Sequence, residues 1–346
     1  MSRSTYKKMT NKDMEAIAKL VLQEGNSHTD AAALTGFPRR SISDFIARNN
    51  KNSKDFWLVW DAYDGKPNFE DRPKVFIFDI ETSPMLGYFW ALFNQNMSID
   101  MIENDWLIMT WAGKWFGEET IYHDSCWDHG FNATEYFMAA ATGDKEYLLE
   151  ADRKVVTSLW AMLEGADMIV AHNGDRFDMK KTTARAVQHG LSPLSPIKKI
   201  DTMKIAKRIG AFSSNKLDWL ARQLCGEMKI DTGGFDLWKR CLRGDEQAWK
   251  HMLDYNIGDV GILEDVWVVL ASFDTKSPSF IAHTDSTITR CNSPACGSTN
   301  VSENGHTHKT TVSEFIGYSC NDCGKQMRGR KNIRSKEQMA ATLLSI

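Results

Sequence analysis

The sequence of 346 residues lacks any apolar run near the roughly 18 residues that a membrane-spanning helix requires. Its first residues, MSRSTYKKMTNKDMEA, include no apolar stretch of the kind found in a signal peptide. Internal repeats and low-complexity tracts are absent as well. Combined with an ordinary composition, 42% hydrophobic and 25% charged, these absences predict a soluble, cytoplasmic protein with one main domain and one or two small modules, and no membrane partner.

Cysteine is sparse until the C-terminal region. Three cysteines are scattered, whereas four cluster as CNSPAC and CNDC, at Cys291, Cys296, Cys320 and Cys323. In a reducing compartment such a foursome indicates metal ligands rather than disulfides. Four thiolates give zinc the closed tetrahedral shell of a structural site, and the glycine after each pair allows a tight turn. We therefore expect one structural Zn²⁺ in a small β zinc ribbon at residues 289–333, with His306 or His308 as alternative ligands.

The net charge of −3 hides an asymmetry. Residues 1–54 carry ten Lys/Arg against five Asp/Glu, and residues 286–346 carry eight against four, which leaves about −12 for the middle of the chain. Basic ends around an acidic centre suggest that the ends meet a polyanion, although chance surface charge is the simpler alternative. The cations of the ribbon expected to contact phosphates are Lys325, Arg328, Arg330 and Lys331, followed by a basic tail at 334–346.

The first 50 residues have the pattern of an all-α helix-turn-helix module. A short helix, the turn glycine Gly36 and a second helix beginning near Pro38 follow one another. Arg39, Arg40 and Ser43 would lie on the early turns of the second helix, where they could contact DNA; a protein-binding role is the alternative. Residues 51–73 and 276–288 read as linkers.

Between these linkers, at residues 74–275, strands and helices alternate. We expect strands at 75–79, 107–115 and 167–172 and around 197–203, and helices at 152–163, 179–189, 216–224 and 246–273. This order is typical of a mixed α/β sheet.

Acidic residues occur where such a sheet gathers its ligands. In VFIFDIETSP, Asp79 and Glu81 end a buried strand and, two residues apart, leave the same face. Asp178 follows the next strand, in HNGDRFD, and Asp259 lies one helical turn after Tyr255 in YNIGD. Four converging carboxylates would repel one another unless cations lay among them, and oxygen ligands suit Mg²⁺ or Mn²⁺.

These three segments resemble the motifs of DEDD 3′–5′ exonucleases, particularly the exonuclease domain of family B DNA polymerases and its stand-alone relatives. The resemblance covers roughly residues 74–272 and implies a ribonuclease-H-like mixed sheet flanked by helices. It also implies two Mg²⁺ or Mn²⁺ ions: Asp79 would bridge both, Glu81 and Asp259 would bind the ion that activates water, and Asp178 the other. Tyr255 would orient the water. A histidine subclass of this family carries a histidine one residue earlier; that residue is Asp254 here, so the tyrosine subclass fits better.

Three further residues match positions near the substrate. Asn173 and Phe177 match those that contact the terminal nucleotides, and Asp201, in KIDTMK, resembles an additional acidic position. About 70 residues follow Phe273, too few for a polymerase, so we expect a free-standing exonuclease or one that serves a replication or repair polymerase in trans.

The expected substrate is therefore DNA, with single-stranded ends favoured. The alternatives are a 3′–5′ exoribonuclease, an endonuclease on the related fold, and a DNA-binding regulatory or recruitment protein with a non-catalytic centre. A phage-encoded protein of this kind would act in the host cytoplasm.

Overall fold

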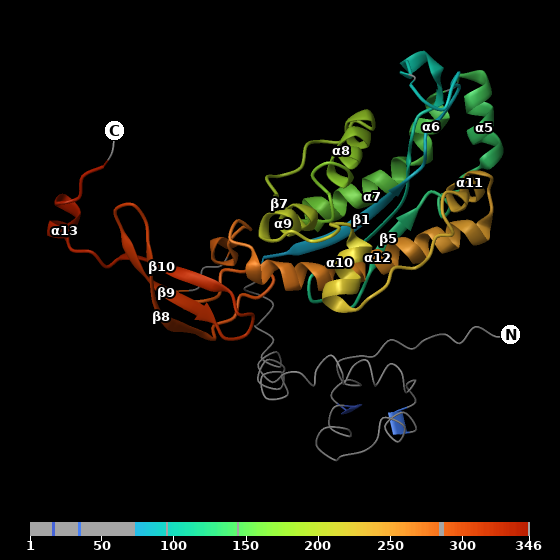
Figure 1. Ribbon diagram of the computed structural model, residues 1–346. Coiled ribbons are helices and arrows are strands. Elements are labelled where there is room, and N and C mark those ends of the chain that lie inside the picture. Colours follow the sequence, from blue (N-terminus) through green and yellow to red (C-terminus); the bar gives the residue numbers. More distant parts are fainter. Residues whose placement is uncertain are drawn as a thin grey trace. The chain divides into compact units, whose positions relative to one another are not determined.

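The computed structural model describes residues 16–17, 34–35, 73–94, 96–143, 145–283 and 287–344. The chain divides into two compact units, Met1–Lys66 and Pro67–Ile346, and the described elements shown in Figure 1 belong almost entirely to the second. The predicted helix-turn-helix contacts Arg39, Arg40 and Ser43 lie outside the described residues, as do residues 51–72 of the first predicted linker.

A five-stranded mixed sheet forms the centre of the second unit. Its strands, in spatial order, are β5 (Tyr122–Ser125), β4 (Ile108–Trp115), β1 (Val75–Thr82), β6 (Met168–Ala171) and β7 (Lys198–Asp201). Strand β4 runs antiparallel to β1 and β5, whereas β6 and β7 run parallel to β1. The mixed sheet and the central place of β1 are as the sequence predicts.

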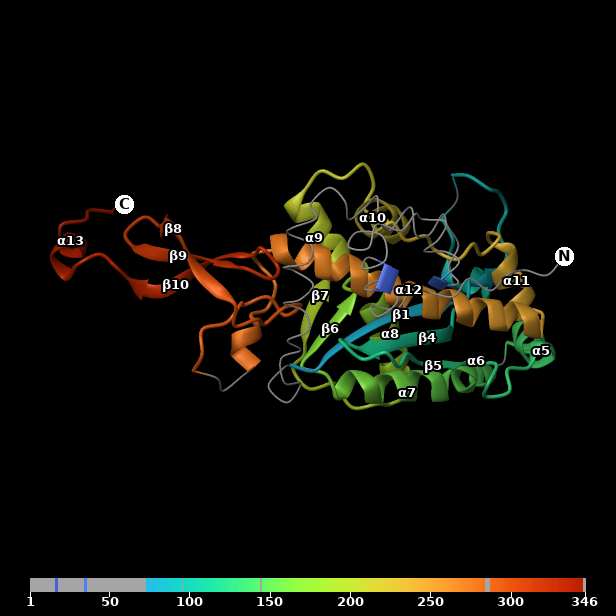
Figure 2. The ribbon, with the colours of Figure 1, turned by 90° about the horizontal axis from the view of Figure 1, so that it is seen from below.

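Strand β1 is buried on both faces by two layers of helices. Phe76, Phe78 and Ile80 pack in a core with α7 (Arg153–Glu164) and α8 (Asp178–Gln188). Val75 and Ile77 face the other way, toward α9 (Thr202–Ile209), α10 (Leu217–Leu220) and α12 (Glu246–Phe273). Figures 1 and 2 show the sheet between these two groups of helices. Because side chains alternate along a strand, Asp79 and Glu81 share the face of β1 that α12 covers.

Several elements were not predicted. They are β2 (Leu86–Gly87), β3 (Ile102–Asn104), β5, α5 (Ala133–Thr142), α6 (Lys145–Ala151), α9, α11 (Asp236–Leu242) and 3-10 turns at Ile99–Met101 and Phe280–His283. The helix expected at 216–224 is instead a short α-helix, α10, that continues as a π-helix at Ala221–Cys225. None of the described helices is both long and apolar enough to cross a bilayer.

The C-terminal region is a separate antiparallel sheet in the order β10 (Gln326–Asn332), β9 (Glu314–Cys320) and β8 (Val301–Lys309). Of the four clustered cysteines, Cys291 and Cys296 precede β8, Cys320 ends β9 and Cys323 lies in the turn before β10. Part of the predicted basic tail forms a short helix, α13 (Lys336–Ala340), which begins with a capping box between Ser335 and Gln338.

Candidate active site and metal centres

Three of the four predicted acidic residues meet at the carboxyl end of β1. One oxygen each of Asp79, Glu81 and Asp259 can be chosen so that all three atoms lie within 4.8 Å of one another. Asp259 reaches this place because it lies on the stripe of α12 that packs on the sheet, one turn before the buried Leu263. Alternation along β1 and helical spacing along α12 thus bring the carboxylates together.

Asp178 lies beside this group. It is the first residue of α8, is only 2% exposed, and accepts a hydrogen bond through Oδ1 from the Ile80 amide at 3.3 Å. That bond ties Asp178 to the backbone between Asp79 and Glu81. It is not one of the three residues within the 4.8 Å group, so the structure places it next to the group rather than inside it.

The turn that leads into Asp178 is fixed by its neighbours. Asn173 has a φ of +64°, which asparagine tolerates, and a Cβ on Gly174 would lie 2.5 Å from that of Ala171. Asp201 accepts from the Asn173 amide at 3.1 Å and also caps α9 through the Lys204 amide at 3.2 Å. Asp201, expected to contact substrate, therefore has its carboxylate engaged with the main chain and positions this turn.

The ring of Phe177 is 37% exposed at the end of the same turn. This exposure leaves Phe177 accessible beside Asp178, as its predicted contact with a terminal nucleotide requires.

A lysine that the sequence analysis missed completes the site. The ammonium of Lys229 donates to Asp259 Oδ2 and, at 3.2 Å, to the hydroxyl of Tyr255, and it lies 5.1 Å from the centre of the Tyr255 ring. Tyr255 is thus held beside Asp259, as predicted. Lys229 lies in an irregular loop, where no periodic pattern could have pointed to it.

Asn256 was also missed. It is fully buried, its Nδ2 donates to Asp79 Oδ2 at 2.8 Å, and its Oδ1 accepts from the Thr110 hydroxyl at 3.0 Å. Its position among the apolar residues of α12 could have predicted a role for Asn256, because a buried side-chain amide needs hydrogen-bond partners.

The site strongly disfavours negative charge. Burial, followed by repulsion from Asp178 and Glu81, raises the pKa of Asp79 well above its usual value. Burial and then Asp259 raise the pKa of Glu81 to about 8, burial raises that of Asp178 to about 7, and burial also raises the pKa of Asp259. The single ammonium of Lys229 can balance only one of the four carboxylates.

The donor set fits divalent cations. Asp259 Oδ1 is buried without a hydrogen-bond partner in the described part of the chain, as expected of an oxygen shaped to bind a metal. The side chains that converge supply carboxylate oxygens, which suit Mg²⁺ and Mn²⁺.

The four clustered cysteines also converge, with their sulfurs within 4.8 Å of one another. The distance between the sulfurs of Cys291 and Cys323 is 3.6 Å, and that between Cys296 and Cys320 is 3.7 Å. A tetrahedron with Zn–S bonds of about 2.3 Å has edges of about 3.8 Å, so the spacing fits a ZnS₄ site. The glycines after each pair have the positive φ that the turns require, +68° and +74°. His306 and His308 are exposed and outside this group.

The cations of the C-terminal sheet and its cysteine-bearing turns, residues 289–333 and here called the ribbon, divide into two kinds. Arg328, Arg330 and Lys331 are exposed on β10, and the Arg328 guanidinium stacks 4.0 Å from the centre of the Phe315 ring. Lys325, by contrast, is 5% exposed and donates to the carbonyls of Ala271 and Asp274 at the end of α12. The expectation that Lys325 contacts phosphate is therefore wrong, because its ammonium is engaged in holding the ribbon to that helix.

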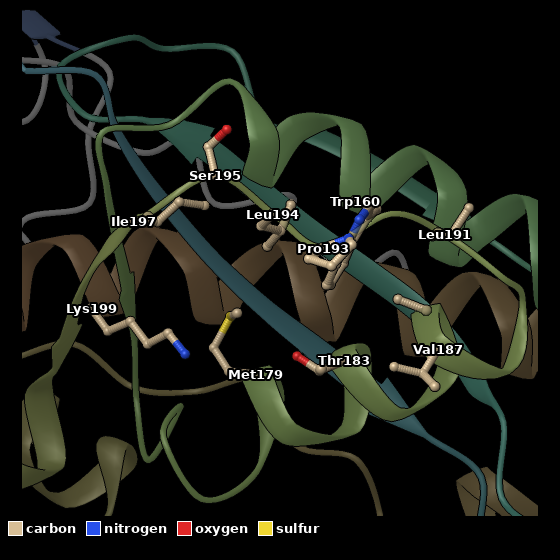
Figure 3. A pocket seen from close by; sticks show the side chains of 11 residues that line it. Trp160, Met179, Thr183, Val187, Leu191, Pro193, Leu194, Ser195, Ile197 and Lys199 are labelled. Atoms are coloured by element: carbon tan, nitrogen blue, oxygen red, sulfur yellow. The ribbon is translucent and has the colours of Figure 1, made fainter.

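A separate pocket of about 400 Å³ opens between α7 and α8 (Figure 3). Apolar side chains dominate its wall, among them Trp160, Met179, Val187, Leu194 and Ile197. Met179 follows Asp178 in sequence, but the described residues that line the pocket include no carboxylate. This pocket is therefore distinct from the acidic site.

One family model agrees with the fold of the central domain. The profile RNase_H_2, of the RNase_H superfamily, matches residues 117–271, a range that includes Asp178, Tyr255 and Asp259 but not β1. Among solved structures, the family B DNA polymerase of the hyperthermophilic archaeon Pyrobaculum calidifontis is similar, with 14% identity and a TM-score of 0.40 over 58% of this chain. The similarity spans 25% of that polymerase. A comparison with curated proteins found no match. The central domain has a ribonuclease-H-like fold.

Proposed function

We propose that the protein is a metal-dependent 3′–5′ exonuclease that hydrolyses phosphodiester bonds at DNA ends. The observation that carries this proposal is the meeting of Asp79, Glu81 and Asp259 within 4.8 Å, with Asp178 beside them, on a ribonuclease-H-like domain. A structural role for these acids is the weaker explanation. Asp178 and Asp259 are buried and Asp79 and Glu81 partly buried, and this burial raises all four pKa values and costs stability without a cation.

In this proposal the four carboxylates hold two Mg²⁺ or Mn²⁺ ions, which would supply an activated water and stabilise the leaving oxygen. Burial and the Asp259 charge raise the pKa of Tyr255 to about 12, so its hydroxyl stays protonated and can orient a water. Burial opposes the charge on Lys229, but Asp259 raises its pKa above the usual value, so the side chain stays an ammonium that holds Asp259 and Tyr255 together. Asn256 fixes the rotation of Asp79.

The C-terminal sheet would carry one structural Zn²⁺ on its four cysteines and anchor nucleic acid through Arg328, Arg330 and Lys331. Exposed arginines on one edge strand suit a phosphate backbone. The N-terminal module would provide a second anchor through Arg39, Arg40 and Ser43.

The test is shortening of end-labelled single-stranded DNA by the full chain in Mg²⁺, beside RNA of the same sequence and a circular DNA. Asp79→Asn and Asp259→Asn should abolish shortening, whereas Asp254→Asn, an exposed carboxylate on the same helix, should leave it intact. Preference for RNA would favour the exoribonuclease, and cleavage of the circle would favour an endonuclease. Nucleic-acid binding that persists in EDTA, with no cleavage in Mg²⁺, would refute the proposal in favour of a recruitment protein.

A further inference from the structure

A short loop after β1 exposes a concentration of aromatic rings. The side chains of residues 88–93, here the aromatic loop, have exposed fractions of 71% for Tyr88, 57% for Phe89, 94% for Trp90, 79% for Leu92 and 79% for Phe93. Contiguous apolar surface of this kind usually marks a binding site. The sequence from residue 82 to 99 contains no charged residue, so the loop itself offers nothing to attract a phosphate.

The base of the aromatic loop is fixed in place. Gly87 in β2 pairs with Ile102 in β3, and the Tyr88 amide donates to the Met101 carbonyl at 2.9 Å. A Cβ on Gly87 would lie 2.5 Å from the Met101 oxygen, so the close approach of the two strands requires glycine. The segment projects from the domain in both views, drawn in cyan to teal (Figures 1 and 2).

Two rings, the partly buried Trp106 and the exposed Phe177, lie between the strands β2 and β3 and the acidic site. Trp106 follows β3 by two residues, and the ammonium of Lys181 lies 3.6 Å from the centre of its ring. The same ammonium is 5.9 Å from the centre of the ring of Phe177, the residue before Asp178. Tyr88 is the seventh residue after Glu81, so the chain between them spans at most about 25 Å. A strand of a few nucleotides could therefore reach from the carboxylates to the loop.

We infer that the aromatic loop binds the unpaired bases of the strand whose end enters the acidic site, an inference that rests on the proposed nuclease function. Flat exposed rings without charge are suited to stacking on base faces, which are open in a single strand and hidden in a duplex. Lys181 supplies the cation for a phosphate between the loop and the carboxylates. The substrate class is accordingly a single-stranded nucleic acid, or a duplex end that has frayed.

The experiment measures binding of a labelled single-stranded oligonucleotide to the full chain carrying Asp79→Asn, which removes cleavage from the measurement. Trp90→Ala/Phe93→Ala should weaken binding at least about tenfold, since each stacked ring contributes several-fold or more. Phe273→Ala removes a ring that is 70% exposed at the far end of α12 and should change nothing. Trp90→Tyr/Phe93→Tyr should keep the affinity of the parent chain, whereas Trp90→Leu/Phe93→Leu should bind as weakly as the alanine pair.

Salt dependence separates stacking from charge. Because the loop is uncharged, its variants should weaken binding equally at all salt concentrations, leaving the slope of log affinity against log salt unchanged. In the cleavage-competent chain the alanine pair should keep the wild-type rate on the p-nitrophenyl ester of thymidine monophosphate, which is too small to reach the loop.

Unchanged affinity of the alanine pair would overturn the inference, as would full binding by the leucine pair. Dimers of the wild type that disappear in the alanine pair, with oligonucleotide affinity unchanged, would show instead that the loop joins two copies. These outcomes are read from binding, so they are separate from a failure of the wild type to cut any oligonucleotide, which would refute the proposed function.

Discussion

Replacing Asn256 with leucine tests how the acidic site is held together. Asn256 is fully buried between Thr110 and Asp79, and its amide fixes one oxygen of Asp79 from 2.8 Å away. Groups that orient a metal ligand typically change metal affinity by about 10- to 100-fold. The Asn256→Leu variant should therefore need about 10 to 100 times more Mg²⁺ for half-maximal cleavage, which corresponds to about 1.4–2.7 kcal/mol of cation binding.

The same substitution should also lower stability. It leaves the Thr110 hydroxyl and an oxygen of Asp79 without their partner, and an unsatisfied buried polar group costs about 1–3 kcal/mol. Denaturant unfolding would measure this loss and set conditions under which the variant is fully folded.

The assay is a Mg²⁺ titration of the cleavage rate on an end-labelled oligonucleotide. The rate of Asn256→Leu at saturating Mg²⁺ should return to near the wild-type value, because the carboxylates themselves are intact. Thr110→Val removes the bond from Thr110 to Asn256 but keeps the bond from Asn256 to Asp79. It should therefore shift the midpoint of the Mg²⁺ titration less than Asn256→Leu does. A wild-type titration midpoint, or a lost rate that no Mg²⁺ concentration restores, would refute the view that Asn256 acts by orienting Asp79.

Three further outcomes are expected. Burial lowers the pKa of His172 to about 4, so stability should fall as the pH drops from 6.5 to 4, by up to about 3 kcal/mol, and His172→Gln should remove this loss when unfolding is followed across that range. Arg185→Met leaves the fully buried Asp152 without its guanidinium partner and should cost about 3–5 kcal/mol in denaturant unfolding; a loss under 1 kcal/mol would contradict this. Cys320→Ser should make the ribbon susceptible to protease and lower bound zinc, with cleavage of short oligonucleotides retained.

The acidic site was predictable as far as local periodicity reaches. Alternation along the buried strand predicted that Asp79 and Glu81 share one face, and helical spacing predicted that Tyr255 and Asp259 lie together. The packing of α12 on that face of the sheet then brings the two pairs into one site. The spacing of the cysteines was readable for the same reason, since the two members of each pair lie only five and three residues apart in sequence.

Contacts that depend on three-dimensional packing were not predictable. Lys229 comes from a loop whose path follows no repeat, and the partners of Asn256 lie in strands 146 and 177 residues away in sequence. Asp201 matched a motif position but is engaged by backbone amides. Lys325 was grouped with its exposed neighbours because charge alone cannot distinguish a surface cation from one that caps a helix.

The buried ammonium of Lys325 has a practical consequence for mapping the ribbon by alanine scanning. Substituting it would release two carbonyl oxygens at the end of α12. Under the proposed anchoring role of the ribbon, the variant would therefore lose nucleic-acid affinity through misfolding of the ribbon rather than through a missing phosphate contact. A scan scored by affinity alone would rank this position beside Arg328. Melting curves recorded for each variant would separate the two causes.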